Sequence, residues 1–210
     1  MKKFLALLSC AVLMAATAVG CGSQNEKITV VSREDGSGTR SAFSELMGVV
    51  KDDKDNTTDT AEVTNSTSVM LTTVAGNKAA IGYVSLGSLN DTVKAVKVDG
   101  VEASAENVKA GKYAVSRPFN IVTNGEATDP VAVDFISYIL STDGQAVVDE
   151  KGYISITQGE TYKASGQTGT LTIAGSTSVA PLMEVLVDKY MALNSGVKIE
   201  IQQSGSSAGI

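Results

Sequence analysis

Short runs of apolar residues, bounded by polar and small residues, recur along this chain of 210 residues. Runs rich in Val and Ile are typical of β-strands, and a run in which apolar residues alternate with Lys is typical of a half-exposed strand. We therefore predict strands at Ile28–Ser32, Ala80–Ser85, Val93–Val98, Phe119–Thr123, Leu171–Ala174 and Val197–Gln202.

Between these strands lie segments whose apolar residues recur every three or four positions, as on one face of a helix. The pair Asp129-Pro130 is a helix start, with Asp as the cap and Pro in the first turn. Strands that alternate with helices predict an α/β protein, and the last two strands form a β-α-β unit. We predict helices at Arg40–Met47, Thr67–Ala75, Glu102–Lys112, Val131–Leu140, Gly144–Glu150 and Val179–Ala192, and an exposed loop at Lys51–Thr60.

Three of the predicted strands end in a turn of Gly, Ser and Thr that leads into a helix start. The turns are Gly36-Ser-Gly-Thr39, Gly175-Ser-Thr-Ser178 and Ser204-Gly-Ser-Ser-Ala208. A helix N-terminus offers unpaired N–H groups and a partial positive charge, so each turn is a potential seat for an anion. Taken alone, the first turn is better explained as a helix cap or turn, and the second and third turns are equally well explained as helix caps. Together they predict a site that holds one small oxyanion from several sides.

The first turn carries additional chemistry, because Arg33 stands at the end of the strand before it. The guanidinium of Arg33 and the hydroxyls of Ser37 and Thr39 are donors for an oxyanion, and glycine lets successive N–H groups converge. Two roles are open to Asp35: it accepts a proton from a protonated phosphate, or it pairs with Arg33 and holds that side chain. The spacing favours the pair with Arg33.

The N-terminal segment predicts export. Lys2 and Lys3 precede an apolar stretch, and small residues stand before Cys21. This pattern resembles a bacterial lipoprotein signal at residues 1–20, whose removal leaves Cys21 as a lipid-modified first residue. The alternative is ordinary secretion with an unpaired Cys21. Residues 21–27 are expected to form a tether, so we predict an extracytoplasmic protein anchored by lipid to the outer face of the cell membrane.

The composition excludes several classes of function. The formal net charge is −6, which argues against nucleic acid as a partner and requires any anion to be bound by local dipoles and cations. The chain contains no His, no zinc-type cluster of Cys and no P-loop ending in Gly-Lys-Ser/Thr. We therefore expect a binding protein without metal or cofactor, and not an enzyme.

At the level of whole motifs, the chain resembles the phosphate-binding lipoproteins that feed high-affinity phosphate ABC transporters. The similar segments are Val30–Phe43, Ala79–Gly87, Arg117–Thr123, Asp134–Gln145, Ile173–Leu182 and Gln203–Gly209. The resemblance implies a two-lobed, type II periplasmic-binding-protein-like α/β fold with the ligand between the lobes. It places residues 28–117 mainly in one lobe and residues 118–210 mainly in the other, with a linker at about 159–169.

The same resemblance implies the ligand and the partner. Inorganic phosphate is the ligand, and the membrane permease of a phosphate ABC transporter receives it for import. Ser178 stands where many relatives carry an aromatic residue, and the resemblance implies that this position contributes its backbone N–H. The implied phosphate-binding residues are Arg33, Ser37, Gly38, Thr39, Thr177, Ser178 and Ser206, with Asp35 behind them.

The order of the motifs departs from the family pattern, because segments that usually come last stand first here. This order resembles a circular permutation, which compact domains tolerate since their termini often lie close together. The family segment that supplies an aspartate acceptor for protonated phosphate has no match in this chain. We therefore expect a continuation beyond Ile210, and weak phosphate binding without it. Sulfate binding is the main alternative function, and a secreted phosphatase is a further one.

Overall fold

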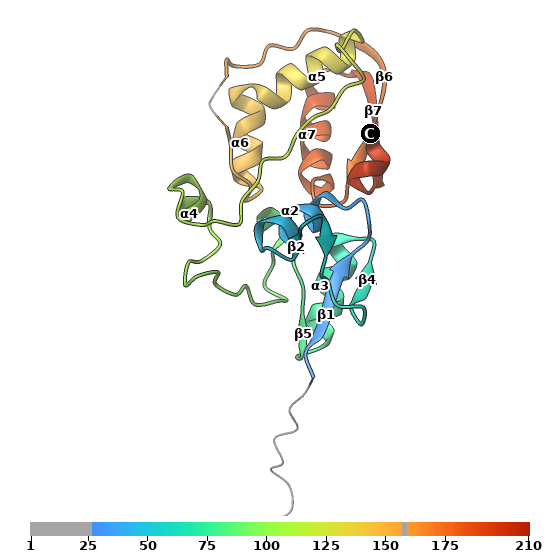
Figure 1. Cartoon of the computed structure of the whole chain (residues 1–210). Coiled ribbons are helices and arrows are strands. Elements are labelled where there is room, and N and C mark those ends of the chain that lie inside the picture. Colours follow the sequence, from blue (N-terminus) through green and yellow to red (C-terminus); the bar gives the residue numbers. More distant parts are fainter. Residues whose placement is uncertain (1–26, 157–158) are drawn as a thin grey trace, which may run out of the picture.

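The computed structural model describes residues 27–156 and 159–210, whose elements form two groups (Figure 1). The N-terminal group contains β1 (Thr29–Arg33), α2 (Gly38–Leu46), β2 (Val50–Lys51), β3 (Lys54–Asp55), β4 (Glu62–Thr64), α3 (Thr67–Gly76) and β5 (Ala80–Ile81). The C-terminal group contains α5 (Pro130–Leu140), α6 (Thr142–Glu150), β6 (Thr168–Ser176), α7 (Ala180–Leu193) and β7 (Gly196–Ser204). The 3₁₀ turn η1 (Leu86–Ser88) and α4 (Ala105–Lys109) lie between the groups in sequence, and the 3₁₀ turn η2 (Ser206–Gly209) follows β7.

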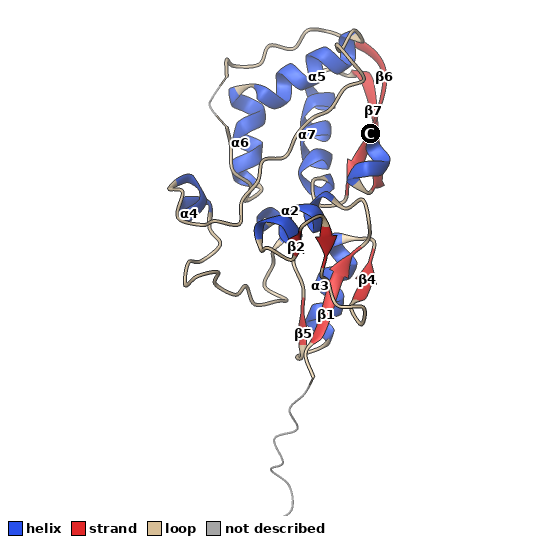
Figure 2. Ribbon diagram, viewed as in Figure 1, coloured by secondary structure: helices blue, strands red, loops and turns tan. Residues whose placement is uncertain are grey.

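Both groups are built on parallel strands, as expected for an α/β protein (Figure 2). In the N-terminal group β1 is the central strand of the order β4-β1-β5. In the C-terminal group β6 pairs with β7 from Thr168 opposite Gly196 to Ser176 opposite Ser204. Because two parallel strands in register end at the same edge, the turns after β6 and β7 lie side by side.

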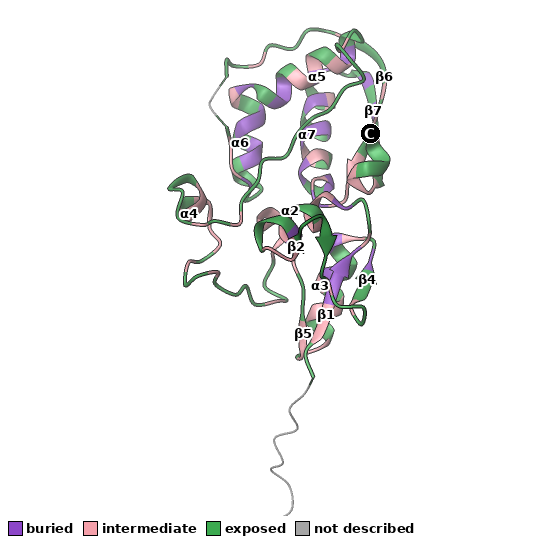
Figure 3. Cartoon of the chain, in the orientation of Figure 1, coloured by how far each residue is buried: buried purple, intermediate pink, exposed green. Residues whose placement is uncertain are grey.

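The largest apolar core lies in the C-terminal group, where α5 and α7 pack on the β6–β7 pair and α6 packs on both helices (Figure 3). The apolar stripe predicted for α7 faces this core, since Leu182, Leu186 and Tyr190 are buried. The predicted face of α5 is buried as well and includes Phe135 and Tyr138. Removal of these side chains from water stabilises the packing that positions the start of α7.

Two predicted strands are wrong: Val93–Val98 and Phe119–Thr123 are irregular in the structure. The first keeps only an isolated bridge to Val101, and the second packs through Phe119 against the ring of Tyr153. A strand needs a neighbouring strand to satisfy its backbone groups, and an apolar pattern alone does not show whether one is present.

Two further predictions need correction in detail. The expected loop at Lys51–Thr60 contains the antiparallel hairpin β2–β3, whose turn residues Asp52 and Asp53 have φ angles of 50° and 59°. The expected buried strand at Ala80–Ser85 ends at Ile81, whose side chain is half-exposed. This strand pairs only with β1 among the described residues, so it lies at an edge of the sheet and does not require a long buried run.

The predicted signal at 1–20 and the lipid site at Cys21 lie outside the described residues, as does the tether up to residue 26. Within the described ranges, no helix is both long enough and apolar enough to cross a membrane. The predicted linker at about 159–169 is held against α5, because the hydroxyl of Tyr162 donates to Asp134 at 2.6 Å. The division into lobes near residue 117 stays a prediction.

Candidate functional site

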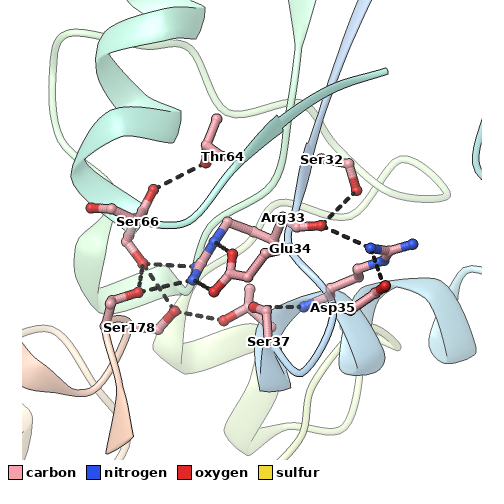
Figure 4. Close-up of polar contacts among 12 residues, drawn as sticks. Ser32, Arg33, Glu34, Asp35, Ser37, Thr64, Ser66 and Ser178 are labelled. Carbon is pink, nitrogen blue, oxygen red and sulfur yellow. Dashed lines mark hydrogen bonds and ion pairs between the residues drawn. The ribbon is translucent and has the colours of Figure 1, made fainter. Parts of the chain in front are cut away.

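β1 ends at Arg33, whose guanidinium is buried where the two groups of elements meet (Figure 4). Both carboxylate oxygens of Glu34 accept hydrogen bonds from this guanidinium at 2.8 Å. The hydroxyls of Thr67 and Thr177 accept from it at 3.2 and 3.0 Å. The backbone N–H of Arg33 donates to the hydroxyl of Tyr83 at 3.0 Å, which fixes the end of the strand. Arg33 is therefore an oriented cation with several N–H groups directed at hydroxyl oxygens.

The predicted pair between Arg33 and Asp35 is wrong, because Asp35 pairs with Arg40 at 2.7 Å instead. Glu34 follows Arg33 directly and reaches both Nε and Nη2, so it takes the position that was expected for Asp35. The side chain of Asp35 is almost fully exposed on the outside of the turn. Its carboxylate thus supports the first turn through Arg40 and does not touch Arg33.

A second carboxylate anchors Arg40. Asp55 of the β2–β3 hairpin accepts from Arg40 at 2.8 Å and from both the hydroxyl and the N–H of Thr57. Hydrogen bonds from Thr57, followed by the bond from Arg40, lower the pKa of Asp55 to about 2. Asp55 therefore stays charged at any physiological pH and keeps the hairpin attached to the first turn.

The first turn lies very close to the third turn, and glycine permits this approach. Gly36 has a φ of 80°, and its carbonyl accepts from the N–H of Ser207 at 3.1 Å. The N–H of Gly38 donates to the hydroxyl of Ser206 at 3.2 Å. A Cβ atom on Gly38 would stand 2.6 Å from Ser206 Oγ, so a larger residue requires the Ser206 hydroxyl to move away from the N–H of Gly38.

The second turn meets the first turn and the start of α3 through four hydroxyl groups, those of Thr39, Thr67, Thr177 and Ser178, which we name the hydroxyl cluster. Thr39 Oγ1 lies 2.5 Å from Ser178 Oγ. Thr67 Oγ1 lies 3.1 Å from Ser178 Oγ and 3.2 Å from Thr177 Oγ1. Each hydroxyl can rotate to donate to a neighbouring acceptor, so the cluster and Arg33 form a set of convergent donors.

Three helix N-termini meet at the hydroxyl cluster. Thr39 lies in the first turn of α2, Thr67 begins α3, and Ser178 comes shortly before α7. None of these helices has an acidic residue in its first turn, so no local carboxylate of the helix cancels the partial positive charge. Convergent helix dipoles beside a buried guanidinium favour the binding of a small anion.

The other predicted site residues have somewhat different roles from those expected. Ser37 is buried and caps α2, because its hydroxyl accepts from the N–H of Arg40 at 3.3 Å. The N–H of Ser178 donates to the hydroxyl of Ser176, so it is the side chain of Ser178 that belongs to the cluster. Ser206 begins the 3₁₀ turn η2, where the sequence predicted an α-helix start.

Thr67 and Glu34 were missed as site residues. The helix α3 was predicted, but its start was not recognised as an anion seat. The signal was present, because Asn65-Ser-Thr-Ser68 places short hydroxyl side chains ahead of an apolar helix, as in the three recognised turns. Glu34 had no signal beyond its position next to Arg33.

The chemistry of the site is that of a set of hydrogen-bond donors. In the part of the chain that the structure describes, no group of three or more His, Cys, Asp or Glu side chains is arranged to hold a metal ion. The carboxylates that follow Arg33 in the first turn, Glu34 and Asp35, are both paired with arginine. The arrangement therefore suits the binding of an oxyanion.

Parallel sheets in two groups, with a donor-lined site where the groups meet, define an α/β binding protein. A family model described as "PBP superfamily domain" matches residues 18–143. The chain is 49% identical over 219 residues to "Phosphate-binding protein PstS 2" of Streptococcus agalactiae, a match that covers 99% of this chain and 75% of that protein. The chain therefore belongs to the PstS family of phosphate-binding proteins.

Solved structures show the same relationship. A crystal structure of a phosphate-binding protein of a phosphate ABC transporter from Streptococcus pneumoniae is 47% identical, with a TM-score of 0.68. That match covers 87% of this chain and 72% of the other. A phosphate ABC transporter substrate-binding protein from Clostridium perfringens, solved with bound phosphate, is 44% identical with a TM-score of 0.58, over 62% of this chain and 52% of that one. The expected type II periplasmic-binding-protein-like fold is confirmed.

Proposed function

We propose that this protein binds inorganic phosphate outside the cytoplasm and delivers it to the permease of an ABC transporter. The observation that carries the proposal is the buried guanidinium of Arg33, set among four hydroxyls at the meeting point of three helix N-termini. Such an arrangement stabilises a multiply charged oxyanion although the chain as a whole is acidic. The relatives named for phosphate binding support the choice of ligand.

The binding roles follow from the contacts. Arg33 supplies charged donors, and the hydroxyls of Thr39, Thr177 and Ser178 supply neutral ones from two sides. The N–H of Gly38 and the hydroxyl of Ser206 now bond each other, and both become available to phosphate oxygens when the bond opens. Ser37 contributes by capping α2, which holds the first turn in place. The site is thus a binding site that changes no covalent bond.

The N-terminal segment supports a position at the outer face of the membrane. Export through the signal at 1–20 places the protein outside the cytoplasm, and lipid on Cys21 anchors it to the outer face of the membrane. This anchor keeps the phosphate-loaded protein close to the permease. The relatives are named as phosphate-binding proteins, which supports a transport role over the phosphatase alternative.

The protonation state of the ligand decides between phosphate and sulfate. A protonated phosphate donates a hydrogen bond, and a fully ionised sulfate does not, so a free carboxylate acceptor favours phosphate. Glu34 and Asp35 are both engaged with arginine, so neither is offered as that acceptor.

Calorimetric titration of the complete mature protein tests the proposal. We expect phosphate to bind with a Kd of about 1 μM or lower, sulfate to bind much more weakly, and no hydrolysis of a phosphate ester. Arg33→Gln should weaken phosphate binding about a hundredfold, because charged hydrogen bonds to the ligand are lost. Lys198→Gln removes the same charge from the surface and should change nothing. Sulfate binding as tight as phosphate binding, or equal effects of the two variants, would overturn the proposal.

A further inference from the structure

Thr67 contacts several of the predicted site residues, although it was not predicted to be one of them. It is the first residue of α3 and its residue surface is only 5% exposed. Its hydroxyl contacts Arg33, Thr177 and Ser178 at 3.2, 3.2 and 3.1 Å. Arg33 belongs to the N-terminal group and the other two belong to the C-terminal group, so one hydroxyl contacts both.

The chemistry of a hydroxyl limits how these contacts are made. Thr67 Oγ1 accepts from Nη1 of Arg33, because a guanidinium has only donors. Its single proton then remains for one acceptor, which is an oxygen of the C-terminal group or of a bound oxyanion. Thr67 therefore fixes the orientation of the guanidinium and directs one donor toward the position where the hydroxyls converge.

The N-terminus of α3 has no side-chain cap, which leaves its N–H groups available to the site. Ser66 stands at the cap position of α3 (Figure 4). Its hydroxyl forms a hydrogen bond with the hydroxyl of Ser68 at 2.8 Å and does not accept from an N–H of the helix. The partial positive charge at this helix start is therefore not reduced by a side-chain cap. Thr67 lies where that charge faces the guanidinium and the hydroxyl cluster.

We propose that Thr67 is a positioning residue of the oxyanion site, which holds the Arg33 guanidinium in its binding orientation and joins α3 to the turn before α7. This inference rests on the phosphate binding proposed above. It adds α3 as a third helix of the site, beside α2 and α7, and it predicts that the hydroxyl of Thr67 contributes to phosphate affinity while its methyl group does not.

Four variants of the complete mature protein separate the hydroxyl from the rest of the side chain. Thr67→Val keeps the shape and removes the hydroxyl, whereas Thr67→Ser keeps the hydroxyl and removes the methyl group. Thr67→Ala differs from Thr67→Ser by the hydroxyl alone. Thr72→Val is the matched control, because Thr72 lies on the same helix, is exposed, and bonds only the carbonyl of Ser68.

Phosphate affinity is measured by calorimetry, and the folded state is checked by thermal unfolding without phosphate. We expect Thr67→Val and Thr67→Ala to weaken binding about tenfold or more, which is the size of one lost hydrogen bond to a charged group. Thr67→Ser should restore an affinity close to that of the wild type, and Thr72→Val should not change it. Restoration by serine distinguishes positioning of Arg33 from simple packing.

Unchanged affinity in Thr67→Val and Thr67→Ala would overturn the inference, since the hydroxyl would then be without effect. So would an equal loss in Thr67→Ser, or failure of both hydroxyl-free variants to fold, because Thr67 would then be a structural residue. A wild-type protein that does not bind phosphate would overturn the proposed function instead. The two failures are therefore distinguishable.

Discussion

At Gly38, a side chain should have opposite effects on the stability of α2 and on the contact between the first and third turns. Gly38 is the first residue of α2, and glycine loses more conformational freedom on folding than alanine does. The same position faces Ser206, whose hydroxyl accepts from the N–H of Gly38. A Cβ atom there would approach Ser206 Oγ to 2.6 Å, which is closer than ordinary van der Waals contact. Glycine at this position therefore permits the close contact with Ser206 of the third turn.

We predict that Gly38→Ala weakens phosphate binding at least tenfold while the free energy of unfolding without phosphate stays the same or rises. The physical reason is that the methyl group displaces the Ser206 hydroxyl from its place beside the N–H of Gly38, where both groups face the proposed ligand. Calorimetry gives the affinity and urea unfolding gives the stability. Gly76→Ala is the control, because a Cβ atom at that end of α3 meets nothing within 4 Å. Equal affinities of the two variants would contradict the prediction.

The sequence predicted which residues of the three turns lie together, but it did not predict their neighbours from other segments. Arg33 and Thr39 flank the same glycine-containing turn, so both could be proposed as donors from the sequence, and their role toward a ligand stays a prediction. Thr67 is 34 positions away from Arg33 along the chain. No sequence pattern states which helix start faces which strand end. The choice of Glu34 over Asp35 as partner of Arg33 also depended on the path of the turn.

At the scale of elements, a part-buried polar contact joins α5, α7 and the segment before β6. Asp134 of α5 accepts from the hydroxyl of Tyr190 at 2.7 Å and from that of Tyr162 at 2.6 Å. Burial raises the pKa of Asp134, but the hydrogen bonds from Tyr162 and Tyr190 outweigh it and hold that pKa below its usual value. Burial, followed by the bond to Asp134, raises the pKa of Tyr190 far above its usual value.

We predict that Asp134→Asn lowers the free energy of unfolding by about 1.5 kcal/mol at pH 7, since both tyrosine hydroxyls lose a charged acceptor. The folded pKa of Asp134 lies below the unfolded one, so its contribution is complete above about pH 4 and is lost as the pH falls. The difference between wild type and variant should therefore shrink at pH 3. Urea unfolding at both pH values measures it.

Asp188→Asn provides the control for that experiment, because Asp188 is exposed on the outer face of α7. It removes the same charge from the same group of elements without touching the tyrosines. We expect its stability to match that of the wild type at both pH values. A loss as large as that of Asp134→Asn, or a loss independent of pH, would show that the Asp134 contact is not the cause.

Helices were predicted better than strands for a physical reason. A helix satisfies its backbone groups within one segment, so periodicity and caps such as Asp129 suffice to locate it. A strand depends on a second segment. The apolar runs at Val93–Val98 and Phe119–Thr123 do not pair in the described structure and remain irregular, whereas β6 and β7 pair with each other along their full length.

For the molecule as a whole, family membership was predictable from the motifs, whereas the contacts between distant segments were not. The first turn lies near the start of the described chain, and the second and third turns lie near its end (Figure 1). The structure brings all three together. The circular permutation inferred from their order stays a prediction, as does the assignment of the two groups to two lobes.

The contacts between the two groups lead to a prediction about the entire protein. Phosphate held by residues of both groups should stabilise both together, by about 4 kcal/mol at a thousandfold excess over Kd. Hydrogen exchange measured by mass spectrometry should therefore slow in peptides covering 31–46 and 171–190 to a similar extent. A peptide covering 98–116, which contains α4 and lacks the hydroxyl cluster, is the internal reference. Sulfate at equal ionic strength should have little effect, and protection of only one of the two site peptides would show that phosphate does not bridge the groups.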